Sequence, residues 1–411
     1  MDILHMDVAE QKLNDKLINR SDHAPFSASL RNNTILLISP QPWDHIAISK
    51  HHYARELAAR DNEVYFVEPP DPHLPSPLAV QTTDDDPRIH RVSYRPTLLD
   101  KMRFHAYSLY KRLIKRRIRY IQRHLPKPVD VVWSFDPNRF PDLCQFDAHY
   151  TIFHPVDPLT NQHQIEMGQT ADIVLTVSKK ILTHFDYHDS AHFINHGLAK
   201  PFESVARKRL SRAYIANQRI KAGYAGNLMR TPVNREIIKD IVSQNSDVEF
   251  HFWGPYSPLP NDGVTSQSIA RFIQWLEAKK NVHFRGTVAP DVLAEEMQKM
   301  DLFFLAYSLH STESDRSNSH KLLEYLSTGR LVISSRVDTY KQFSPELILM
   351  PESADDRELP TLFQHAKQNI SRLNNQKLQD ARIQIALANR YADHLDKIEK
   401  HLTVASPRIA A

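Results

Sequence analysis

The sequence is poor in cysteine and has no long apolar run. Its single cysteine, Cys144, excludes an internal disulfide bond and a metal site built from several thiolates. The apolar stretches are too short to span a bilayer. The polar N-terminal segment lacks the charged and then apolar pattern of a secretory signal. Together these absences favour a cytoplasmic protein.

Glycine is also scarce, with 8 residues in a chain of 411. Because glycine marks places where the backbone bends or closely approaches another group, each position is informative. Gly226 and Gly286 end two apolar segments, IKAGYAG and NVHFRG. We interpret these segments as strands that lead into tight turns.

Two series of alternating strands and helices predict an α/β protein with two doubly wound, Rossmann-like domains. The first series begins with TILLIS and EVYFVE and continues with DVVWSF, HYTIF, DIVLTVS and HFIN. The second contains IKAGYAG, DVEFHFWG, NVHFRG, DLFFLAY, RLVISS and ELILM. Ligands of such sheets bind at the carboxyl ends of the strands, here in a central cleft between the domains. The predicted parts are a flexible arm at 1–30, a first domain at 31–200, a linker at 201–217, a second domain at 218–380, and a helical tail at 381–411 that packs back towards the first domain.

The segment SNSHKLLEYLSTGRLVISS, residues 317–335, combines a helix with an unusually placed lysine. Ser317 or Ser319 can cap the helix, whose N-terminal N–H groups and partial positive charge suit a phosphate. Lys321 in the first turn is unfavourable for the helix by itself, which indicates an anion nearby. Glu324, one turn further on, would face the same cleft and accept hydrogen bonds from sugar hydroxyls. The alternative is an ordinary capped helix with Lys321 in solvent.

The same segment closely resembles the nucleotide-sugar-binding segment of GT-B glycosyltransferases. That segment has a Lys, two or three residues, Glu-Tyr-Leu, a small residue and Gly before a Val- or Ile-rich strand. IKAGYAGNL at 220–228 resembles the first strand and turn of their donor domain, and ADIVLTVSKKIL and FINHGL within 171–198 resemble the end of their acceptor domain. The resemblance spans roughly residues 34 to 400. It implies the GT-B fold, with an acceptor-binding first domain and a donor-binding second domain.

The resemblance also implies roles for individual residues. Lys321 would neutralise the donor diphosphate and Glu324 would bind the ribose hydroxyls. The backbone at Ser319 and His320 would cradle phosphate. Arg230 would be a second diphosphate cation, for which a solvated loop arginine is the alternative. The other donor-binding candidates, in the glycine turn and near the base, are Gly226, Asn227, Arg285, Gly286 and Tyr307.

Arg316 marks a departure from this family pattern. Many retaining members carry an acidic residue eight positions before the Glu of the motif, where this sequence has Arg316, although Glu313 and Asp315 are close. The missing acid favours an inverting reaction, in which a base of the first domain deprotonates the acceptor hydroxyl as it attacks the anomeric carbon. GT-B enzymes usually balance the charge of the leaving diphosphate with helix dipoles and cations, without a metal.

Two loops of the first domain hold candidates for this base. Asp157 follows a predicted strand in HYTIFHPVDPLT, where related sequences commonly have a loop with an acid. Asp44 and His45 lie in the first strand–helix loop, SPQPWDHIAISKHH. Asp157 is the first choice, and Asp44 or His45 the second. A role in a turn or a helix cap is the alternative for each candidate.

The remaining motifs do not predict a metal or another cofactor. Asp84 and Asp86 form a DxD arrangement, which holds a metal on the nucleotide diphosphate in GT-A glycosyltransferases. Here the pair lies in a polar loop rather than directly after a buried strand, which favours a solvated turn. The 23 histidines are scattered and show no HExxH spacing, so a zinc site is not predicted.

Residues 101–125 predict one long helix, and its segment 107–125 is amphipathic with an unbroken basic side. Its apolar residues at 107, 110, 114, 118, 121 and 125 define one face, and no acid lies between Asp100 and Asp130. An anionic membrane is the predicted partner, because each Lys or Arg near such a surface contributes about 1 kcal/mol. The alternatives are a core-packed helix with a solvated basic side and, less favoured because no motif supports it, nucleic acid. The membrane-contact candidates are Lys111, Arg112, Lys115, Arg116, Arg117, Arg119 and Arg123.

Together, the sequence predicts a metal-independent, inverting glycosyltransferase, a hexosyltransferase, at the inner face of the cell membrane. It would move a sugar from a UDP-, GDP- or dTDP-sugar to a polysaccharide or lipid-linked glycan acceptor. One alternative is an isomerase similar to nucleotide-sugar 2-epimerases, which share the double-Rossmann architecture but need no acceptor. Another is a non-catalytic nucleotide-sugar-binding partner of another transferase.

Overall fold

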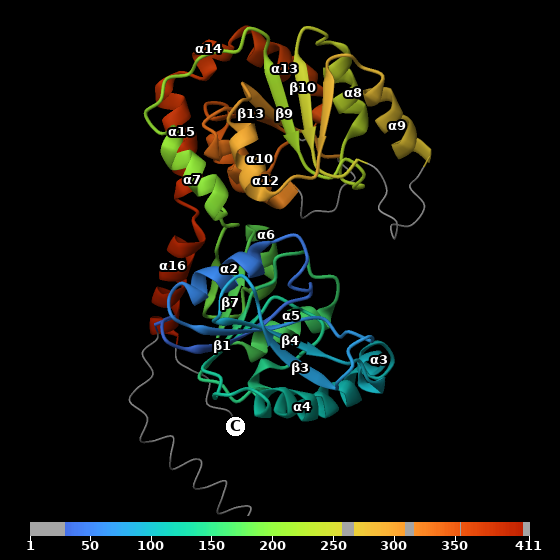
Figure 1. The fold of residues 1–411 in the computed structure, drawn as a ribbon, viewed down its shortest axis with the longest axis vertical. Coiled ribbons are helices and arrows are strands. Elements are labelled where there is room, and N and C mark those ends of the chain that lie inside the picture. Colours follow the sequence, from blue (N-terminus) through green and yellow to red (C-terminus); the bar gives the residue numbers. More distant parts are fainter. Residues whose placement is uncertain (1–28, 257–266, 309–315, 354, 406–411) are drawn as a thin grey trace, which may run out of the picture.

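The computed structural model describes residues 29–256, 267–308, 316–353 and 355–405 (Figure 1). Two α/β domains lie one above the other, and each is built around a mostly parallel sheet. The predicted arm at 1–30 lies outside the described residues except for its last two. None of the described helices combines the length and the apolarity needed to cross a membrane.

The first domain has an eight-stranded sheet in the order β3-β4-β2-β1-β5-β6-β7-β8. Its strands are β1 (Thr34–Ile38), β2 (Glu63–Val67), β3 (Leu78–Thr82), β4 (Ile89–Tyr94), β5 (Val131–Ser134), β6 (Tyr150–Phe153), β7 (Ile173–Thr176) and β8 (Ala191–Phe193). Its helices are α2 (Ser49–Ala58), α3 (Leu98–His105), α4 (Tyr107–Arg123), α5 (Gln162–Glu166) and α6 (Lys179–Leu182). Only β3 and β4 pair antiparallel. The strand order reverses between β1 and β5, and such a switch point opens a crevice at the carboxyl ends of the strands.

The second domain has a six-stranded parallel sheet in the order β11-β10-β9-β12-β13-β14. Its strands are β9 (Lys221–Ala225), β10 (Glu249–Trp253), β11 (Val282–Gly286), β12 (Leu302–Leu305), β13 (Leu331–Ser334) and β14 (Ile348–Leu349). Its helices are α7 (Lys200–Arg209), α8 (Arg235–Ser243), α9 (Gln267–Glu277), α10 (Pro290–Met297), α12 (His320–Ser327), α13 (Leu359–Gln368), α14 (Ile370–Leu373) and α15 (Gln376–Leu387). The switch point here lies between β9 and β12, so both domains are doubly wound, as the sequence predicts.

The strands were predictable because helices cover both faces of each sheet. Strands buried on both faces read as continuous apolar runs rather than as alternating patterns. TILLI of β1, IVLT of β7 and LFFL of β12 are buried at every residue. β3 breaks this rule, since LAVQT is half-buried or exposed throughout. For that reason the β3–β4 hairpin at the edge of the first sheet was not predicted.

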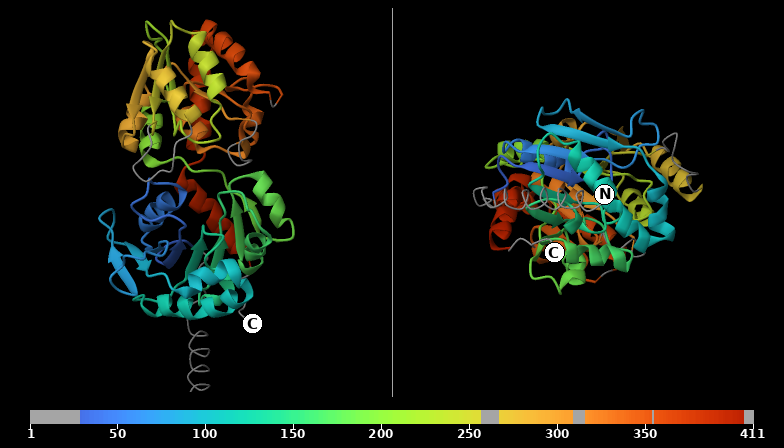
Figure 2. Two further views of the ribbon diagram at one scale, coloured as in Figure 1. Left: turned by 90° about the vertical axis from the view of Figure 1, so that its right-hand side faces the viewer. Right: turned by 90° about the horizontal axis from the view of Figure 1, so that it is seen from below.

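The last helix, α16 (Tyr391–Val404), returns from the second domain to the first (Figure 2). Tyr391, Leu395 and Ile398 belong to the same buried cluster as strands of the first sheet. The Glu399 carboxylate accepts a hydrogen bond of 2.7 Å from the backbone N–H of Leu30. The C-terminal helix thus ties the two domains together by its own packing.

Two segments differ from the sequence prediction. Helix α7 occupies the first half of the predicted linker, and its Phe202, Val205 and Ala206 join the core of the second domain. The segment was predicted to be a linker because it is mostly polar, and its few apolar residues at helical spacing were not recognised as one face of a helix. The single helix predicted at 101–125 is two helices, α3 and α4, because the backbone of Ala106 leaves the helical conformation with φ −146° and ψ 58°.

Candidate active site

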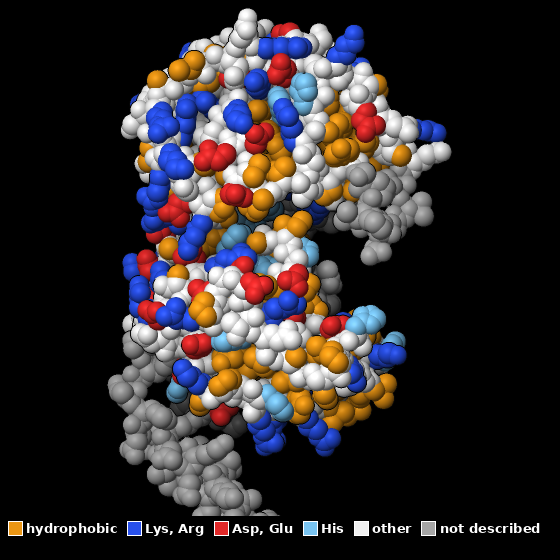
Figure 3. Space-filling view, viewed as in Figure 1, with side chains coloured by type: hydrophobic (Ala, Val, Ile, Leu, Met, Phe, Trp, Pro, Cys, Tyr) orange, Lys and Arg blue, Asp and Glu red, His pale blue; other side chains and the backbone are white. Residues whose placement is uncertain are grey.

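A cleft with a volume of about 520 Å³ lies between the two domains. Figure 3 shows the molecule narrowing between its upper and lower parts, where the cleft opens. The loops after β1 and β6 and the start of α2 line it from the first domain, and the turns after β9 to β12 and the start of α12 line it from the second. The lining residues with polar chemistry include Lys50, His52, Asp157, His196, Asn227, Arg230, Ser319, His320, Lys321 and Glu324.

Three glycines stand at the carboxyl ends of adjacent strands of the second sheet. Gly226, Gly254 and Gly286 have positive φ angles of 157°, 111° and 68°. A Cβ on Gly254 would lie 2.5 Å from the carbonyl oxygen of Gly226. The backbone N–H of Gly254 also donates a hydrogen bond of 2.8 Å to the carbonyl of Gly286. These turns pack backbone against backbone, which leaves space above them for a ligand.

The side chain of Lys321 extends across the first of these turns. Its Cε lies 2.6 Å from the position that a Cβ on Gly226 would take. Lys321 is 9% exposed, lies in the first turn of α12, and makes no hydrogen bond or ion pair within the described part of the chain. A shielded cation at a helix N-terminus is unfavourable unless an anion joins it. The geometry therefore suits a negatively charged ligand over Gly226.

The N-terminus of α12 is held in place from both domains. Asn318 donates hydrogen bonds to the Val177 carbonyl and to the Asn195 side chain of the first domain, at 2.5 and 2.7 Å. Ser319 is the N-cap, but its side chain does not cap the helix and lies 3.0 Å from the Tyr307 hydroxyl. The first-turn N–H groups therefore lack a side-chain cap, as expected of a helix end that binds an anion.

Burial controls the charges inside the cleft. It raises the pKa of the Glu324 carboxyl to about 7, against the attraction of Lys321. Burial and then Lys321 lower the pKa of His196 to about 4, and desolvation in the cleft followed by Lys321 holds the pKa of His320 well below its ordinary value. Near neutral pH these histidines are uncharged, so the cations of this side are Lys321 and Arg230.

Asp157 and Lys50 line the cleft from the first domain. Asp157 is exposed in the loop after β6, and Lys50 is 1% exposed in the first turn of α2. Burial lowers the pKa of Lys50 to about 8, opposed by the negative charges of Asp157 and then Asp136. Lys50 makes no hydrogen bond or ion pair within the described residues. The first domain thus offers a carboxylate with a lysine beside it.

Asp44 and His45 do not line the cleft, although the sequence made them second choices for the base. The exposed Asp44 carboxylate pairs with Arg91 at 2.8 Å. The His45 ring bonds to the carbonyl of Ile46 at 2.9 Å and is exposed. The loop after β1 instead turns its next residues, from Ile46 onward, into the cleft.

Arg285 and Gly286 are also outside the lining of the cleft. The exposed Arg285 guanidinium donates to Nδ1 of His251, with nitrogen–nitrogen distances of 3.1 and 3.2 Å. The two residues after Gly286, Thr287 and Val288, face the cleft in their place. The predicted pair lies within β11, which extends to Gly286, so the loop that faces the cleft begins only after it.

Arg316, which replaces the acid of many retaining enzymes, has a structural role. Its guanidinium donates to the carbonyls of Tyr307 at 2.9 Å and Ser308 at 3.2 Å, and pairs with the buried carboxylate of Asp356. The nearby acids Glu313 and Asp315 lie outside the described residues. Arg316 therefore anchors the strand that ends at the cleft.

The DxD pair lies in the turn that joins β3 and β4. The Asp86 carboxylate accepts a hydrogen bond of 2.8 Å from the backbone N–H of Arg88, as a turn aspartate does. Neither Asp84 nor Asp86 lines the cleft. This placement agrees with the interpretation of the pair as a solvated turn.

Helix α4 has an exposed basic side, but the Arg117 side chain is not part of it. Tyr110, Ile114, Ile118 and Ile121 are buried on the first domain. The Arg117 side chain, 9% exposed, pairs with Asp100 at 2.5 Å and packs over the Tyr94 ring. The exposed basic residues of α4 are Arg112, Lys115, Arg116, Arg119 and Arg123.

Sequence reasoning missed several polar residues of the cleft, among them Lys50, His52 and His196. His52 and His196 are uncharged near neutral pH, since burial lowers the pKa of each to about 4. A signal for Lys50 was available, because a lysine in the first turn of a helix after the first strand repeats the arrangement of Lys321. Nothing in the pattern distinguished His196 from the other histidines.

Comparisons with known proteins agree with this fold. Residues 223–356 match the family model described as glycosyl transferases group 1. None of the curated protein sequences compared with the chain matches it. Solved structures, however, align over nearly its whole length.

Three solved structures illustrate the likeness. An α,α-trehalose 6-phosphate synthase from Burkholderia multivorans is 11% identical, with a TM-score of 0.65 over 92% of this chain and 100% of its own. A sucrose-phosphate synthase from Thermosynechococcus elongatus is 13% identical, with a TM-score of 0.65 over 91% and 100%. HepE from Anabaena, in complex with UDP and glucose, is 13% identical, with a TM-score of 0.59 over 90% and 99%.

The predicted GT-B fold is thereby confirmed. The match to the glycosyl transferases group 1 model places a domain of that family within the second domain of the chain.

Proposed function

We propose that the protein transfers a sugar from a nucleotide-diphosphate sugar to a glycan or lipid-linked acceptor, without a metal. The observation that carries the proposal is Lys321, which is shielded over Gly226 at the start of α12 and has no ion-pair partner among the described residues. There it would neutralise the donor diphosphate, while Glu324 would bind the ribose. UDP is the nucleotide we favour, because HepE, a protein of the same fold, is known in complex with UDP and glucose. GDP and dTDP are the alternatives.

For the chemical step we propose that Asp157 takes the proton of the attacking acceptor hydroxyl, with inversion at the anomeric carbon. An aspartate exposed in the cleft can reach a bound hydroxyl, and the buried Lys50 of the same side interacts with it electrostatically. Lys50 is also a cation for a phosphate of a lipid-linked acceptor. Lys321, Arg230 and the N-terminus of α12 would stabilise the charge that develops on the leaving diphosphate. Inversion is supported by the place of Arg316, which is bound to Asp356 where many retaining enzymes have an acid.

A panel of UDP-, GDP- and dTDP-sugars incubated with the protein tests this proposal. We expect slow hydrolysis of one donor without added acceptor, undiminished by a chelator, and a product whose anomeric configuration by NMR is opposite to that of the donor. Retained configuration would contradict the role of Asp157, and epimerised donor would favour the isomerase. Tight binding without turnover, with any acceptor, would favour the non-catalytic partner.

We further propose that the protein works at the cytoplasmic face of an anionic membrane, where lipid-linked acceptors of polysaccharide synthesis would be within reach. Figure 3 shows basic and hydrophobic side chains together at the end of the first domain where α3 and α4 lie. Leu98, Phe104 and Leu109 of these helices are 76%, 70% and 48% exposed. Apolar side chains beside a basic helix suit the interface of a bilayer.

Binding to liposomes tests the membrane proposal. Replacing Arg112, Arg116 and Arg119 with Gln should weaken binding to anionic liposomes on the order of 100-fold, at about 1 kcal/mol for each charge. Arg117→Gln is the matched control, since its charge is held by Asp100 and it should lower stability rather than release the protein. Equal binding to neutral and anionic liposomes would overturn the proposal.

A further inference from the structure

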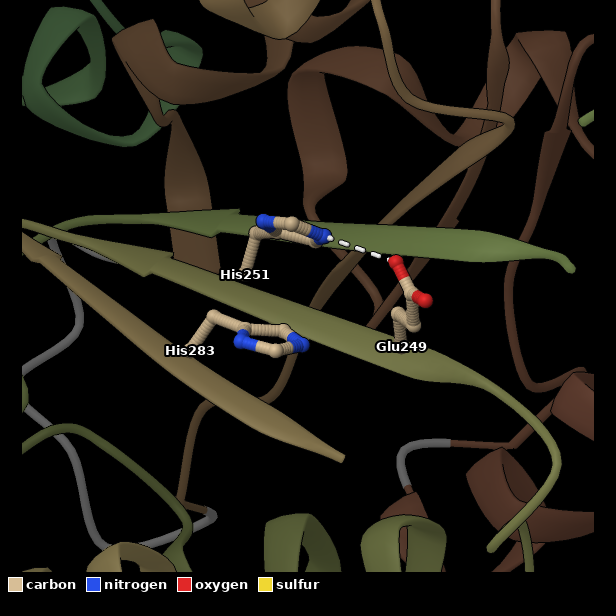
Figure 4. Close-up of side chains that lie close together, drawn as sticks. All are labelled: Glu249, His251 and His283. Atoms are coloured by element: carbon tan, nitrogen blue, oxygen red, sulfur yellow. Dashed lines mark ion pairs between the residues drawn. The ribbon is translucent and has the colours of Figure 1, made fainter. Parts of the chain in front are cut away.

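A second cluster of metal-ligating side chains lies on the sheet of the second domain. Glu249 and His251 come from β10, and His283 comes from β11 (Figure 4). One ligand atom of each residue lies within 4.8 Å of the others. None of the three lines the cleft. The cluster is thus separate from the candidate active site.

The strand register brings these residues to one face of the sheet. Glu249 and His251 are two residues apart on β10, and alternate residues of a strand point to the same side. His283 pairs directly with His251 in the parallel register of β10 and β11. β11 is the edge strand of the sheet, so Glu249 and His283 are only half-buried.

His251 is the buried member of the cluster, and part of its polar surface has no partner. It is 4% exposed, and its Nε2 makes no hydrogen bond within the described residues. This nitrogen faces the Glu249 carboxylate at 3.7 Å, too long for a hydrogen bond (Figure 4). A buried ring nitrogen without a partner is costly, and a bound ion between the three side chains would satisfy it.

The chemistry of the three ligands suits a zinc-type ion. Neutral imidazole nitrogens and carboxylate oxygens are ligands that Zn²⁺ binds in proteins. Two imidazoles and one carboxylate form a three-ligand set that leaves a fourth position open. Metal–ligand bonds of about 2.0–2.2 Å require the half-buried side chains to close by about 1 Å.

Positive charges oppose an ion at this place. Arg285 donates to Nδ1 of His251, which puts the proton of the neutral ring on Nε2. Lys221 is another cation near His251. An ion can bind only if Arg285 leaves and the proton moves to Nδ1. Arg285 is exposed, and Glu296 of α10 attracts it electrostatically, so it has an alternative partner.

We propose that Glu249, His251 and His283 bind a divalent transition-metal ion such as Zn²⁺, with Arg285 competing for His251. The ion would tie the edge strand β11 to β10 and stabilise the second domain. It lies outside the transfer reaction, so the site does not depend on the proposed function and is compatible with a metal-independent transfer.

Calorimetric titration with Zn²⁺ tests the site, with the full chain freed of any affinity tag. The absorption spectrum of bound Co²⁺ and the melting temperature are measured as well. We expect one equivalent to bind with a Kd of about 1 μM, a tetrahedral Co²⁺ spectrum and a higher melting temperature. His283→Ala and Glu249→Gln should each weaken binding at least tenfold, and Arg285→Gln should strengthen it.

His163→Ala is the matched control, because His163 is an exposed histidine that faces one carboxylate, Glu166 at 3.4 Å, without a third ligand. It should leave Zn²⁺ binding unchanged. Binding weaker than roughly 1 mM, or the same loss in His163→Ala as in His283→Ala, would overturn the proposal. Melting temperatures without metal show that each variant is folded.

Discussion

The two sides of the cleft differ in how far they use backbone groups and side chains. The side of the second domain combines backbone groups, in glycine turns at strand ends and at the N-terminus of α12, with side chains such as Lys321 and Glu324. The side of the first domain consists of side chains such as Asp157 and Lys50. A backbone site requires glycines at fixed positions and therefore leaves a spacing signature in the sequence. A side-chain site in loops leaves a weaker signature, so Asp157 was predicted but Lys50 was missed.

The largest effect should come from the first domain. Asp157→Asn should lower the rate of transfer by roughly 10²- to 10⁴-fold, the usual contribution of a general base, with donor affinity unchanged. Transfer rates and donor titrations measure the two effects separately. Asp44→Asn is the control, since Asp44 is bound to Arg91 outside the cleft. Full activity of Asp157→Asn would refute its role as the base.

The glycine turns should separate binding from stability. Gly226→Ala would displace the flexible end of Lys321, which weakens donor binding about tenfold, and its positive φ adds a smaller loss of stability than the backbone collision at Gly254. Gly254→Ala would meet the backbone of Gly226 at 2.5 Å, at a positive φ, and should lower stability by about 1–3 kcal/mol. Donor titration and urea unfolding of both variants make the comparison. If Gly254→Ala mainly weakened donor binding and Gly226→Ala mainly lowered stability, this account of the turns would be wrong.

The last effect concerns stability alone and involves Glu324 in the ligand-free protein. Because burial raises its pKa from 4.5 to about 7, folding favours the protonated carboxyl. Its contribution to the free energy of unfolding is therefore full below pH 4.5 and is lost as the pH rises to 7, by roughly 2–3 kcal/mol at most. Urea unfolding between pH 4.5 and 7.5 should show a flatter pH dependence in Glu324→Gln. If the free energy of unfolding depended on pH equally in Glu324→Gln and in the unmodified protein, the Glu324 carboxyl would not be held neutral.

The fold was largely predictable, because buried parallel strands leave apolar runs. The exceptions have physical causes: the β3–β4 hairpin is solvated, and α7 carries few apolar residues. In the candidate site, spacing predicted the positions of Lys321, Glu324 and Gly226. It failed at Arg285, because the exact end of β11 is not encoded in composition. The histidine cluster on β10 and β11 depends on strand register, which no local motif reports.

The central claim is that Lys321 binds the diphosphate of the donor, and calorimetric titration with UDP tests it most directly. Lys321→Met should weaken binding roughly 10- to 150-fold, the value of a charge-assisted contact, without loss of melting temperature, since no partner among the described residues is left unpaired. Lys341→Met is the matched control, because Lys341 is exposed in the same domain outside the cleft. If UDP binds both variants and the unmodified protein with equal affinity, Lys321 does not hold the diphosphate and the account of the cleft is wrong.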